Sequence, residues 1–543
     1  MDVILALDIG SSSVRCTAYQ VHDFANISAI TNCSASRTVR LVQPTTGKIQ
    51  LQLGDTTLMD LVDACVDDTL QSLRKLTEPF RVVGVGCSCF VMNLVAVKAD
   101  GSLVGEEASM SYACNAASVA AECQTIRQEL GPQKLDHLYQ QTGSPIHSAY
   151  ALAQLRQFYH SSSKATQNCI LKWQTISSVI VSRWTATATL PISFSEASWT
   201  GLLNVRDCTY ETSIMELLPG KCRDALPKLA DFNDSVFGIS MTTKYWDSWP
   251  ELRDCPLFLG LGDGACANIG SKCSAASRIA VTVGTSAAAR VCLRQGVGSS
   301  SNFQIPKGLW CYRIDKSHVL VGGALTDGGS VVEWASQLLN LSTEEAFLEC
   351  LGKVQVLVDA DHAESSLHND ASSLITIPFL SGERSTGYRD NATGAIMGLT
   401  RDTTPAHVLR SCLEGVALRI RAILKLIVEA SGNSDDNDRP IVVVSGKALE
   451  QNRLWRQMIS DSSGLQVIFD EETHEGTSRG AARLVAAALA VEKDASAEST
   501  SKYLVEEKIQ SFTRCDARPR AQAYFDRTAQ SQDQFIDALT PLY

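Results

Sequence analysis

The chain carries two main patterns of apolar and polar positions. Short apolar runs bounded by glycine or charged residues are typical of buried strands. Apolar residues spaced three or four apart instead predict helices. The predicted strands lie at residues 3–7, 82–90, 258–261, 281–283, 319–321, 374–379 and 441–444.

Two predicted helices stand out among the periodic segments. Apolar residues repeat at helical spacing over 408–427, and Thr403 and Thr404 can cap this helix with Pro405 in its first turn. Residues 477–489 predict a second helix. Strands that alternate with helices indicate an α/β protein. Polar loops are expected at 160–163 and 433–438, and a domain boundary is expected near residue 257.

One local pattern occurs twice, about half a chain apart. Residues 3–15 read VILALDIGSSSVR and residues 279–290 read IAVTVGTSAAAR. Each is an apolar strand, then a glycine, then small hydroxyl residues and an arginine. Backbone N–H groups and hydroxyls in such a turn can bind phosphate oxygens. Two copies suggest a duplicated domain with a nucleotide between the copies.

Composition narrows the class of protein. The 543 residues include 48 Lys and Arg against 59 Asp and Glu, a formal net charge of −11, and 45% are hydrophobic. This composition is globular, and the acidic balance disfavours nucleic acid as a partner. No apolar run reaches the roughly 18 residues that span a bilayer, so no membrane association is expected.

Location is predicted from the N-terminus and the cysteines. Asp2 stands where a signal peptide would carry positive charge, and the apolar stretch stops at Asp8. The 18 cysteines are scattered through apolar segments, without a paired CxxC motif. We expect buried thiols in a reducing, cytoplasmic compartment rather than a metal site.

Several segments, in order, resemble the FGGY family of carbohydrate kinases. Residues 7–15 resemble the family's first phosphate loop, 262–270 the segment with its catalytic aspartate, and 282–286 its second phosphate loop. A further set of residues resembles the family's C-terminal signature: Gly394, Ile396, Gly398, Leu399, His407, Val408, Ser411 and Glu414. Residues 378–384 and 441–464 also look like family segments.

The resemblance implies a two-lobed, actin-like (ribonuclease H-like) ATPase fold. The lobes would be residues 1–257, with the sugar site and the first phosphate loop, and 258–543, with the ATP site and the second loop. ATP would lie in the cleft between them, and the sugar would lie deeper, mainly against the N-terminal lobe. GDGACANIGS and GGALTDGG look most similar to the gluconate kinase branch.

Phosphoryl transfer to a hydroxyl needs a base, a metal ion and donors to the phosphates. Asp263 follows a strand and begins a helix-like segment, where its carboxylate could accept the proton. From the residues alone it could equally cap that helix, and the resemblance favours catalysis. Asp8 ends a strand before the Gly10 turn and is the candidate Mg²⁺ ligand. The alternative for Asp8 is a hydrogen bond that shapes the turn.

Candidate ATP-binding residues fall into two groups. Near the phosphates, the glycines allow tight turns, and Arg15 could reach a phosphate or be a solvated surface charge. This group comprises Gly10, Ser11, Ser12, Arg15, Gly284, Thr285, Ser286, Gly328 and Gly329. Near the adenosine, the resemblance points to Gly446, Lys447 and Gln451. The family usually has a second glycine where Lys447 stands, which bears on nucleotide affinity.

The sugar site departs most from the family pattern. Relatives often carry a His after the strand equivalent to 82–90, and an aromatic–x–Asp–x–Arg segment. This chain has FVMN at 90–93 and YACNA at 112–116. Candidate sugar-binding residues are Asn93, Tyr112, Asn115 and His147, in addition to Asp263. We expect altered substrate choice with catalysis retained.

The leading hypothesis is a Mg²⁺- and ATP-dependent kinase of a small sugar, sugar acid or polyol, with a gluconate-like substrate favoured. The alternatives are a xylulose- or ribulose-type ketopentose or pentitol kinase, and a non-catalytic actin-like regulatory protein. A P-loop enzyme and a Rossmann enzyme are disfavoured, because neither fingerprint occurs. A monomer or homodimer is expected, and residues after 492 are expected to be helical and solvated.

Overall fold

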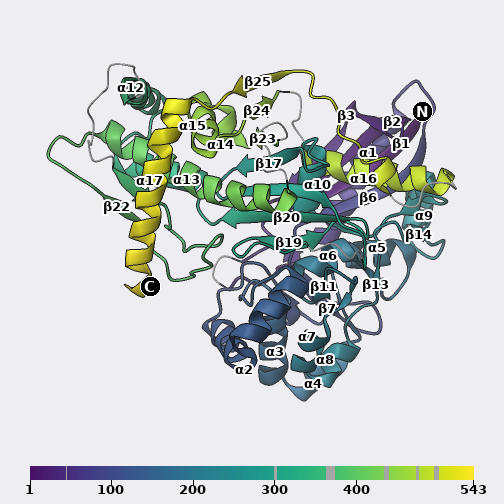
Figure 1. Cartoon of the computed structure of the whole chain (residues 1–543). Helices are drawn as coiled ribbons and strands as arrows, with labels where there is room; N and C mark the ends of the chain where they lie inside the picture. Colours follow the sequence, from purple (N-terminus) through teal and green to yellow (C-terminus); the bar gives the residue numbers. More distant parts are fainter. Residues whose placement is uncertain are drawn as a thin grey trace.

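Two seven-stranded sheets, with helices packed against them, organise the chain. The computed structural model describes residues 1–43, 46–298, 303–361, 374–432, 439–471, 476–494 and 500–542. Figure 1 shows the first sheet in purple near the N-terminus and the second mostly in teal at the centre. The predicted α/β class is therefore confirmed.

The first sheet is built on an antiparallel hairpin of β1 and β2, which β3 extends. On the other side of β1, strand β6 runs parallel to it, and β15 and β16 run parallel to β6. The strands are β1 (Asp2–Ile9), β2 (Ser13–Asp23), β3 (Asn26–Thr38), β6 (Arg81–Cys89), β14 (Val236–Phe237), β15 (Pro256–Leu257) and β16 (Leu261–Gly262).

The second sheet repeats this arrangement. β17 and β18 form an antiparallel hairpin, β20 extends it, and β23 runs parallel to β17. The strands are β17 (Arg278–Val283), β18 (Ala287–Arg294), β19 (Trp310–Arg313), β20 (His318–Leu325), β23 (Ile441–Ser445), β24 (Val467–Asp470) and β25 (Phe512–Cys515). The two glycine turns at 10–12 and 284–286 therefore hold equivalent places in the two sheets.

Shorter strands form small separate sheets. They are β4 (Gln52–Leu53), β5 (Thr56–Thr57), β7 (Leu94–Val97), β8 (Ser109–Met110), β9 (Lys172–Gln174), β10 (Ile192–Ser193), β11 (Leu203–Asn204), β12 (Thr209–Tyr210), β13 (Leu229–Ala230), β21 (Ile375–Ile377) and β22 (Ala395–Met397). β7, β8 and β9 pair with one another beside a mainly helical part of the chain.

That helical part lies below both sheets in Figure 1 and has its own apolar core. It contains α2 (Ala117–Thr142), α3 (Ala151–Ser161), α4 (Lys164–Cys169), α7 (Thr212–Leu217) and α8 (Gly220–Asp224). Around the first sheet lie α1 (Leu58–Arg74), α5 (Ile176–Thr185), α6 (Phe194–Trp199), α9 (Tyr245–Ser248) and α10 (Asp263–Gly270). The remaining helices are α11 (Gly329–Leu338), α12 (Glu344–Asp361), α13 (Pro405–Ser431), α14 (Lys447–Glu450), α15 (Arg453–Ser463), α16 (Gly476–Lys493) and α17 (Pro519–Leu539).

Helix α16 comes late in the sequence but packs on the first sheet, against β1 and β6. Gly84 and Gly86 of β6 leave room for Val485, because a methyl group at either glycine would lie within 2.8 Å of its side chain. Helix α16 also crosses α10, where a methyl group on Gly480 would lie 1.8 Å from the Cys266 carbonyl oxygen. The first sheet thus depends on a helix from the far end of the chain.

The two most periodic predicted helices are confirmed. Helix α13 begins after its N-cap Thr404, with Pro405 in its first turn. Its apolar face is buried in the core of the second sheet. The helix predicted at 477–489 is α16, slightly longer at both ends.

Three local predictions are wrong. The strand predicted at 258–261 is broken, because β15 ends at Leu257 and β16 begins at Leu261. His160 belongs to the last turn of α3 rather than to a loop. After residue 492 the chain forms β25 as well as α17, and Phe525 and Ile536 of α17 are buried. The loop predicted at 433–438 lies outside the described residues.

Candidate active site

The register of the first sheet brings the first glycine turn and Asp263 to one edge. Ile9 lies beside Cys89 of β6, and Gly262 lies beside Cys89 on the other side. Gly10 and Asp263 each follow by one residue. Two strand spacings amount to about 10 Å, so a phosphoryl group and an acceptor hydroxyl fit between them.

Asp263 is the first residue of α10, and Gly262 is the N-cap. The aspartate therefore does not occupy the capping position, although its Oδ1 accepts a hydrogen bond from the Gly264 amide at 2.7 Å. Burial raises the pKa of Asp263 to about 6, and this rise is opposed by the Gly264 amide and by the positive charge of Arg290. At neutral pH the carboxylate is mostly ionised and more basic than an exposed aspartate.

Helix α6 holds the segment that leads to Asp263. Ser193 donates to the Gly260 carbonyl, and Ser195 Oγ accepts from the Gly262 amide at 3.1 Å. Glu196 lies in the same turn, where Thr175 and Ser177 donate to its carboxylate at 2.8 and 2.6 Å. Burial raises the pKa of Glu196 to about 7. These contacts hold in place the backbone segment that immediately precedes Asp263.

Arg290 and Trp199, the first of three stacked aromatic rings, lie beside Asp263, and sequence reasoning assigned none of these four residues a role. Arg290 donates to Thr282 Oγ1 at 3.2 Å, and burial lowers its pKa while Asp263 raises it. Trp199 lies against Gly262 and Gly264. Trp199 stacks on Tyr312 at 3.7 Å between ring centroids, and Trp310 stacks on Tyr312 at 4.7 Å. The only signal for Arg290 was its place at the end of the repeated pattern.

The first glycine turn is held by backbone hydrogen bonds. The Gly10 amide donates to the Ser13 carbonyl at 2.8 Å, while the carbonyls of Ser11 and Ser12 accept from the neighbouring segment 39–41. The Ser12 residue is exposed. Asp8 lies opposite Arg15 in the hairpin register, so a carboxylate and a guanidinium flank this turn.

The second glycine turn packs against two other glycines. The Gly328 and Gly329 amides donate to the carbonyls of Thr285 and Gly284 at 2.8 and 2.7 Å. A methyl group on Gly329 would lie 2.5 Å from the Gly284 oxygen, which explains the glycine there. Gly284, Thr285 and Ser286 are exposed, and a methyl group on Gly284 would meet no atom within 4 Å. The turn therefore leaves space on its outer side for a ligand.

The segment predicted to contact adenosine packs against the end of β17, beside the second glycine turn. Gly446 has φ +98°, and a methyl group on it would lie 2.3 Å from the Val283 carbonyl oxygen, so a glycine is required. Lys447 begins α14, and both Lys447 and Gln451 are exposed. Nucleotide binding by Lys447 and Gln451 therefore stays a prediction.

The candidate sugar residues lie in different surroundings. Asn93 is buried, donates to the Phe90 carbonyl, and accepts from the Ile176 amide at 2.8 Å, so both ends of its amide serve the fold. His147 Nε2 lies 2.6 Å from Asp390 Oδ1, and Asn115 is exposed. Tyr112 packs edge-on against Phe90, which directly follows β6, with ring centroids 6.1 Å apart. Both Tyr112 and Asn93 lie close to the end of β6, beside the strand edge that carries Gly10.

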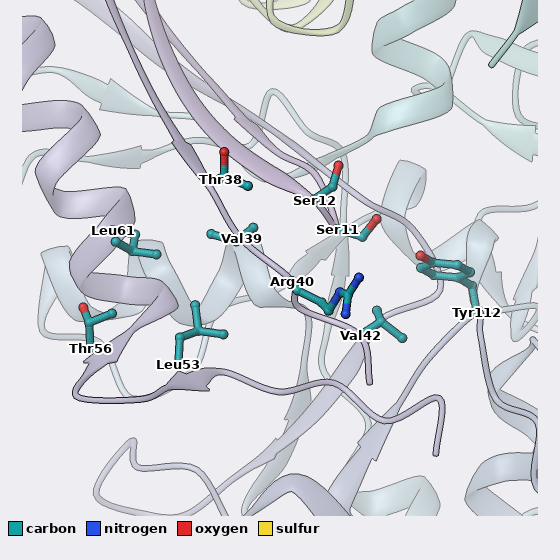
Figure 2. A pocket seen from close by; sticks show the side chains of 10 residues that line it. All are labelled: Ser11, Ser12, Thr38, Val39, Arg40, Val42, Leu53, Thr56, Leu61 and Tyr112. Carbon is teal, nitrogen blue, oxygen red and sulfur yellow. The ribbon is translucent and has the colours of Figure 1, made fainter. Parts of the chain in front are cut away.

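Tyr112 also lines a cavity of about 770 Å³ beside the first glycine turn (Figure 2). Ser11 and Ser12 form part of its wall. Among the residues that the structure describes, no group of three or more His, Cys, Asp or Glu side chains could hold a metal ion. No helix in the described ranges is both long and apolar enough to cross a membrane.

Comparisons with known proteins agree with this geometry. The gluconokinase of Bacillus subtilis (strain 168) is 24% identical over 370 residues, which cover 66% of this chain and 65% of that enzyme, just under two thirds of its length. The xylulose kinase of Escherichia coli (strain K12) is 27% identical over 271 residues, 50% of this chain and 51% of that enzyme. The crystal structure of gluconate kinase from Lactobacillus acidophilus superimposes with a TM-score of 0.78 at 22% identity, covering 99% of this chain and 98% of that one.

The structural match confirms the predicted two-lobed, actin-like fold. A family model for the N-terminal domain of the FGGY carbohydrate kinases matches residues 3–270, and one for the C-terminal domain matches residues 279–489. The predicted domain boundary near residue 257 stays a prediction. Strand β16 at 261–262 still belongs to the first sheet. The chain belongs to the FGGY family of carbohydrate kinases.

Proposed function

We propose that the protein transfers the terminal phosphoryl group of ATP to a hydroxyl of a small sugar acid, with gluconate as the favoured acceptor. The observation that carries this proposal is the shared edge of the first sheet, where Gly10 and Asp263 emerge about 10 Å apart. A partly buried carboxylate at the same sheet edge as a phosphate-binding turn suits phosphoryl transfer. A purely regulatory nucleotide-binding protein has no need of this carboxylate.

Asp263 acts as the general base in this proposal. Its pKa of about 6 leaves it ionised at neutral pH yet basic enough to accept the proton of the attacking hydroxyl. Arg290 lies near enough to favour the ionised form. The rings of Trp199, Trp310 and Tyr312 would exclude water from this side of the carboxylate.

The nucleotide would lie between the two glycine turns. Ser11, Ser12, Thr285 and Ser286 offer hydroxyls and amides to the phosphates, and the space outside Gly284 supports this placement. The adenosine would approach Gly446, with Lys447 and Gln451 beside it. Arg15, which lies opposite Asp8 in the hairpin, would donate to a phosphate.

Mg²⁺ fits this site through Asp8. The ion prefers oxygen ligands and commonly takes one or two carboxylates together with substrate phosphates and water. Asp8 stands at the end of β1, two residues before the first glycine turn. When bound, the ion would neutralise phosphate charge during transfer.

A ketopentose is the second candidate acceptor, because the matched relatives include xylulose kinases as well as gluconokinases. His147 and Asn93 remain sugar-binding predictions, although their contacts in the structure serve the fold. The cytoplasmic location and the monomeric or dimeric state also remain predictions.

The test follows ADP release from Mg²⁺-ATP with gluconate, xylulose, ribulose, ribitol, arabitol, glycerol and sedoheptulose. We expect gluconate to stimulate release, and Asp263→Asn to lower kcat by about 10²- to 10⁴-fold because the base is lost. The exposed Asp402→Asn is the matched control and should keep full activity. Stimulation by no acceptor, or equal rates in the wild type and Asp263→Asn, would contradict the proposed function.

A further inference from the structure

The cavity in Figure 2 lies against the first phosphate loop, on the side of β3 rather than of β16. It measures about 770 Å³. Its walls come from the glycine turn, the end of β3 with the segment after it, the β4–β5 hairpin, α1 and the segment before α2. The residues are Ser11, Ser12, Thr38, Val39, Arg40, Val42, Leu53, Thr56, Leu61 and Tyr112.

The wall of this cavity is bonded directly to the phosphate loop. The Val39 amide donates to the Ser12 carbonyl at 3.0 Å, and the Leu41 amide donates to the Ser11 carbonyl at 3.0 Å. Arg40 is exposed and lines the cavity. A ligand that contacts Arg40 therefore lies next to the phosphate loop.

The side chains that line the cavity carry positive charge and no negative charge. Arg40 is the only charged side chain among the described residues that line the cavity, and no described residue forms an ion pair with it. In Figure 2 its guanidinium extends toward Ser11 and Tyr112. A guanidinium without a carboxylate partner favours an anionic ligand, because it can donate two parallel hydrogen bonds to a carboxylate.

The remaining lining fits a polyhydroxy chain. Hydroxyl groups that the nucleotide phosphates do not use come from Thr38, Thr56 and Tyr112, and can exchange hydrogen bonds with the hydroxyls of a ligand. Apolar side chains come from Val39, Val42, Leu53 and Leu61, and can pack against its C–H groups. A neutral polyol would use the hydroxyls but would leave Arg40 without a partner.

We propose that this cavity binds the far end of the acceptor and that Arg40 binds its carboxylate, so that the acceptor is a sugar acid. The proposal rests on the proposed kinase function. It assigns the reacting hydroxyl to the edge near Asp263 and the carboxylate to the opposite side of Tyr112. Arg40 thereby selects sugar acids over the alditols of equal length.

The first experiment compares Arg40→Gln and Arg40→Lys with the wild type, using five- and six-carbon aldonates and their matching alditols. We expect Arg40→Gln to raise KM for the preferred aldonate by about 10-fold or more, because a charge-assisted hydrogen bond is lost. The value of kcat and the KM for the alditol should stay within twofold. Arg40→Lys should recover part of the loss, and the exposed Arg401→Gln should change nothing.

A second measurement separates this proposal from the proposed function. Isothermal titration of the same aldonates into wild type and Arg40→Gln, without ATP, reports binding alone, and thermal melting checks that both are folded. Aldonate binding that weakens in Arg40→Gln supports the subsite even if no phosphorylation occurs. Phosphorylation with an unchanged aldonate KM in Arg40→Gln would overturn the subsite and leave the kinase standing. Failure of the wild type to bind any aldonate would also overturn it.

Discussion

Asp263 shows how single residues set the chemistry of this site. Burial disfavours its charge, while the Gly264 amide and the Arg290 guanidinium favour it, and the balance leaves a pKa of about 6. Gly264 is the next residue in the chain, whereas Arg290 comes from the hairpin of the other sheet. The basicity of the carboxylate is therefore set by burial, by a local amide and by one contact with the second sheet.

This balance predicts a pH profile. The base is active when ionised, so kcat/KM should fall as pH drops through about 6, the pKa of Asp263 in the free enzyme. Arg290→Gln removes a positive charge that lowers this pKa, so the acid limb should move to higher pH. Arg290→Lys keeps the charge and serves as the control. An acid limb that stays in place in Arg290→Gln would show that Arg290 does not tune the base.

At the scale of elements, the short helix α6 sets the position of the strand before Asp263. Its serines bond to backbone groups on two sides, because Ser195 accepts from the Gly262 amide at 3.1 Å and Ser198 accepts from the Arg313 amide at 2.9 Å. The first bond reaches the catalytic segment, and the second reaches β19. One helix therefore anchors both the carboxylate and the aromatic strand beside it.

The two serines allow a matched comparison. Each alanine variant leaves a buried amide without its acceptor, so each should lower the free energy of unfolding by roughly 1–3 kcal/mol in chemical denaturation. Only Ser195→Ala should also lower kcat several-fold at saturating substrate, because only it loosens the segment of Asp263. Equal kcat in Ser195→Ala and Ser198→Ala would refute this positioning role.

At the scale of the whole molecule, the crossing of α10 and α16 joins the middle of the chain to a helix near its C-terminal end. Helix α10 starts with Asp263, and α16 packs on β1 and β6 of the first sheet. The crossing is close because Gly270 and Gly480 carry no side chain where the partner backbone passes. Any side chain added there would push apart the helices that support the active site.

Glycine substitutions test this crossing. Gly480→Ala would place a methyl group 1.8 Å from the Cys266 carbonyl oxygen, so we expect a loss of several degrees in Tm and of activity. Gly352→Ala in the middle of α12 is the control, since a methyl group there meets no atom within 4 Å. It should raise stability by up to about 1 kcal/mol through helix propensity. A Tm for Gly480→Ala equal to that of Gly352→Ala would contradict the close crossing.

The local pattern of apolar and polar residues predicted much of this fold. The remaining features depend on contacts between residues far apart in the sequence. The hairpins with their glycine turns, α13 and α16 all have periodic sequences, and each is present. Around Asp263, the sequence predicted the backbone elements but not the side chains that surround the carboxylate. Trp199 of α6, Trp310 of β19 and Arg290 of β18 meet there through packing of elements far apart in the sequence, which no spacing along the chain encodes. Asn93 remains a sugar-binding prediction, and its side chain also accepts a buried hydrogen bond from the Ile176 amide.

The late origin of α16 has a consequence for biosynthesis. The strands of the glycine hairpin and β6 are complete at Cys89, but the helix that covers one face of them begins only at Gly476. At about 5–20 residues per second, a ribosome needs roughly 20–80 s to make the intervening chain. During that time the apolar face around Ile4 and Ala6 has no native cover from α16. Newly made protein should therefore depend on chaperones until translation is nearly finished.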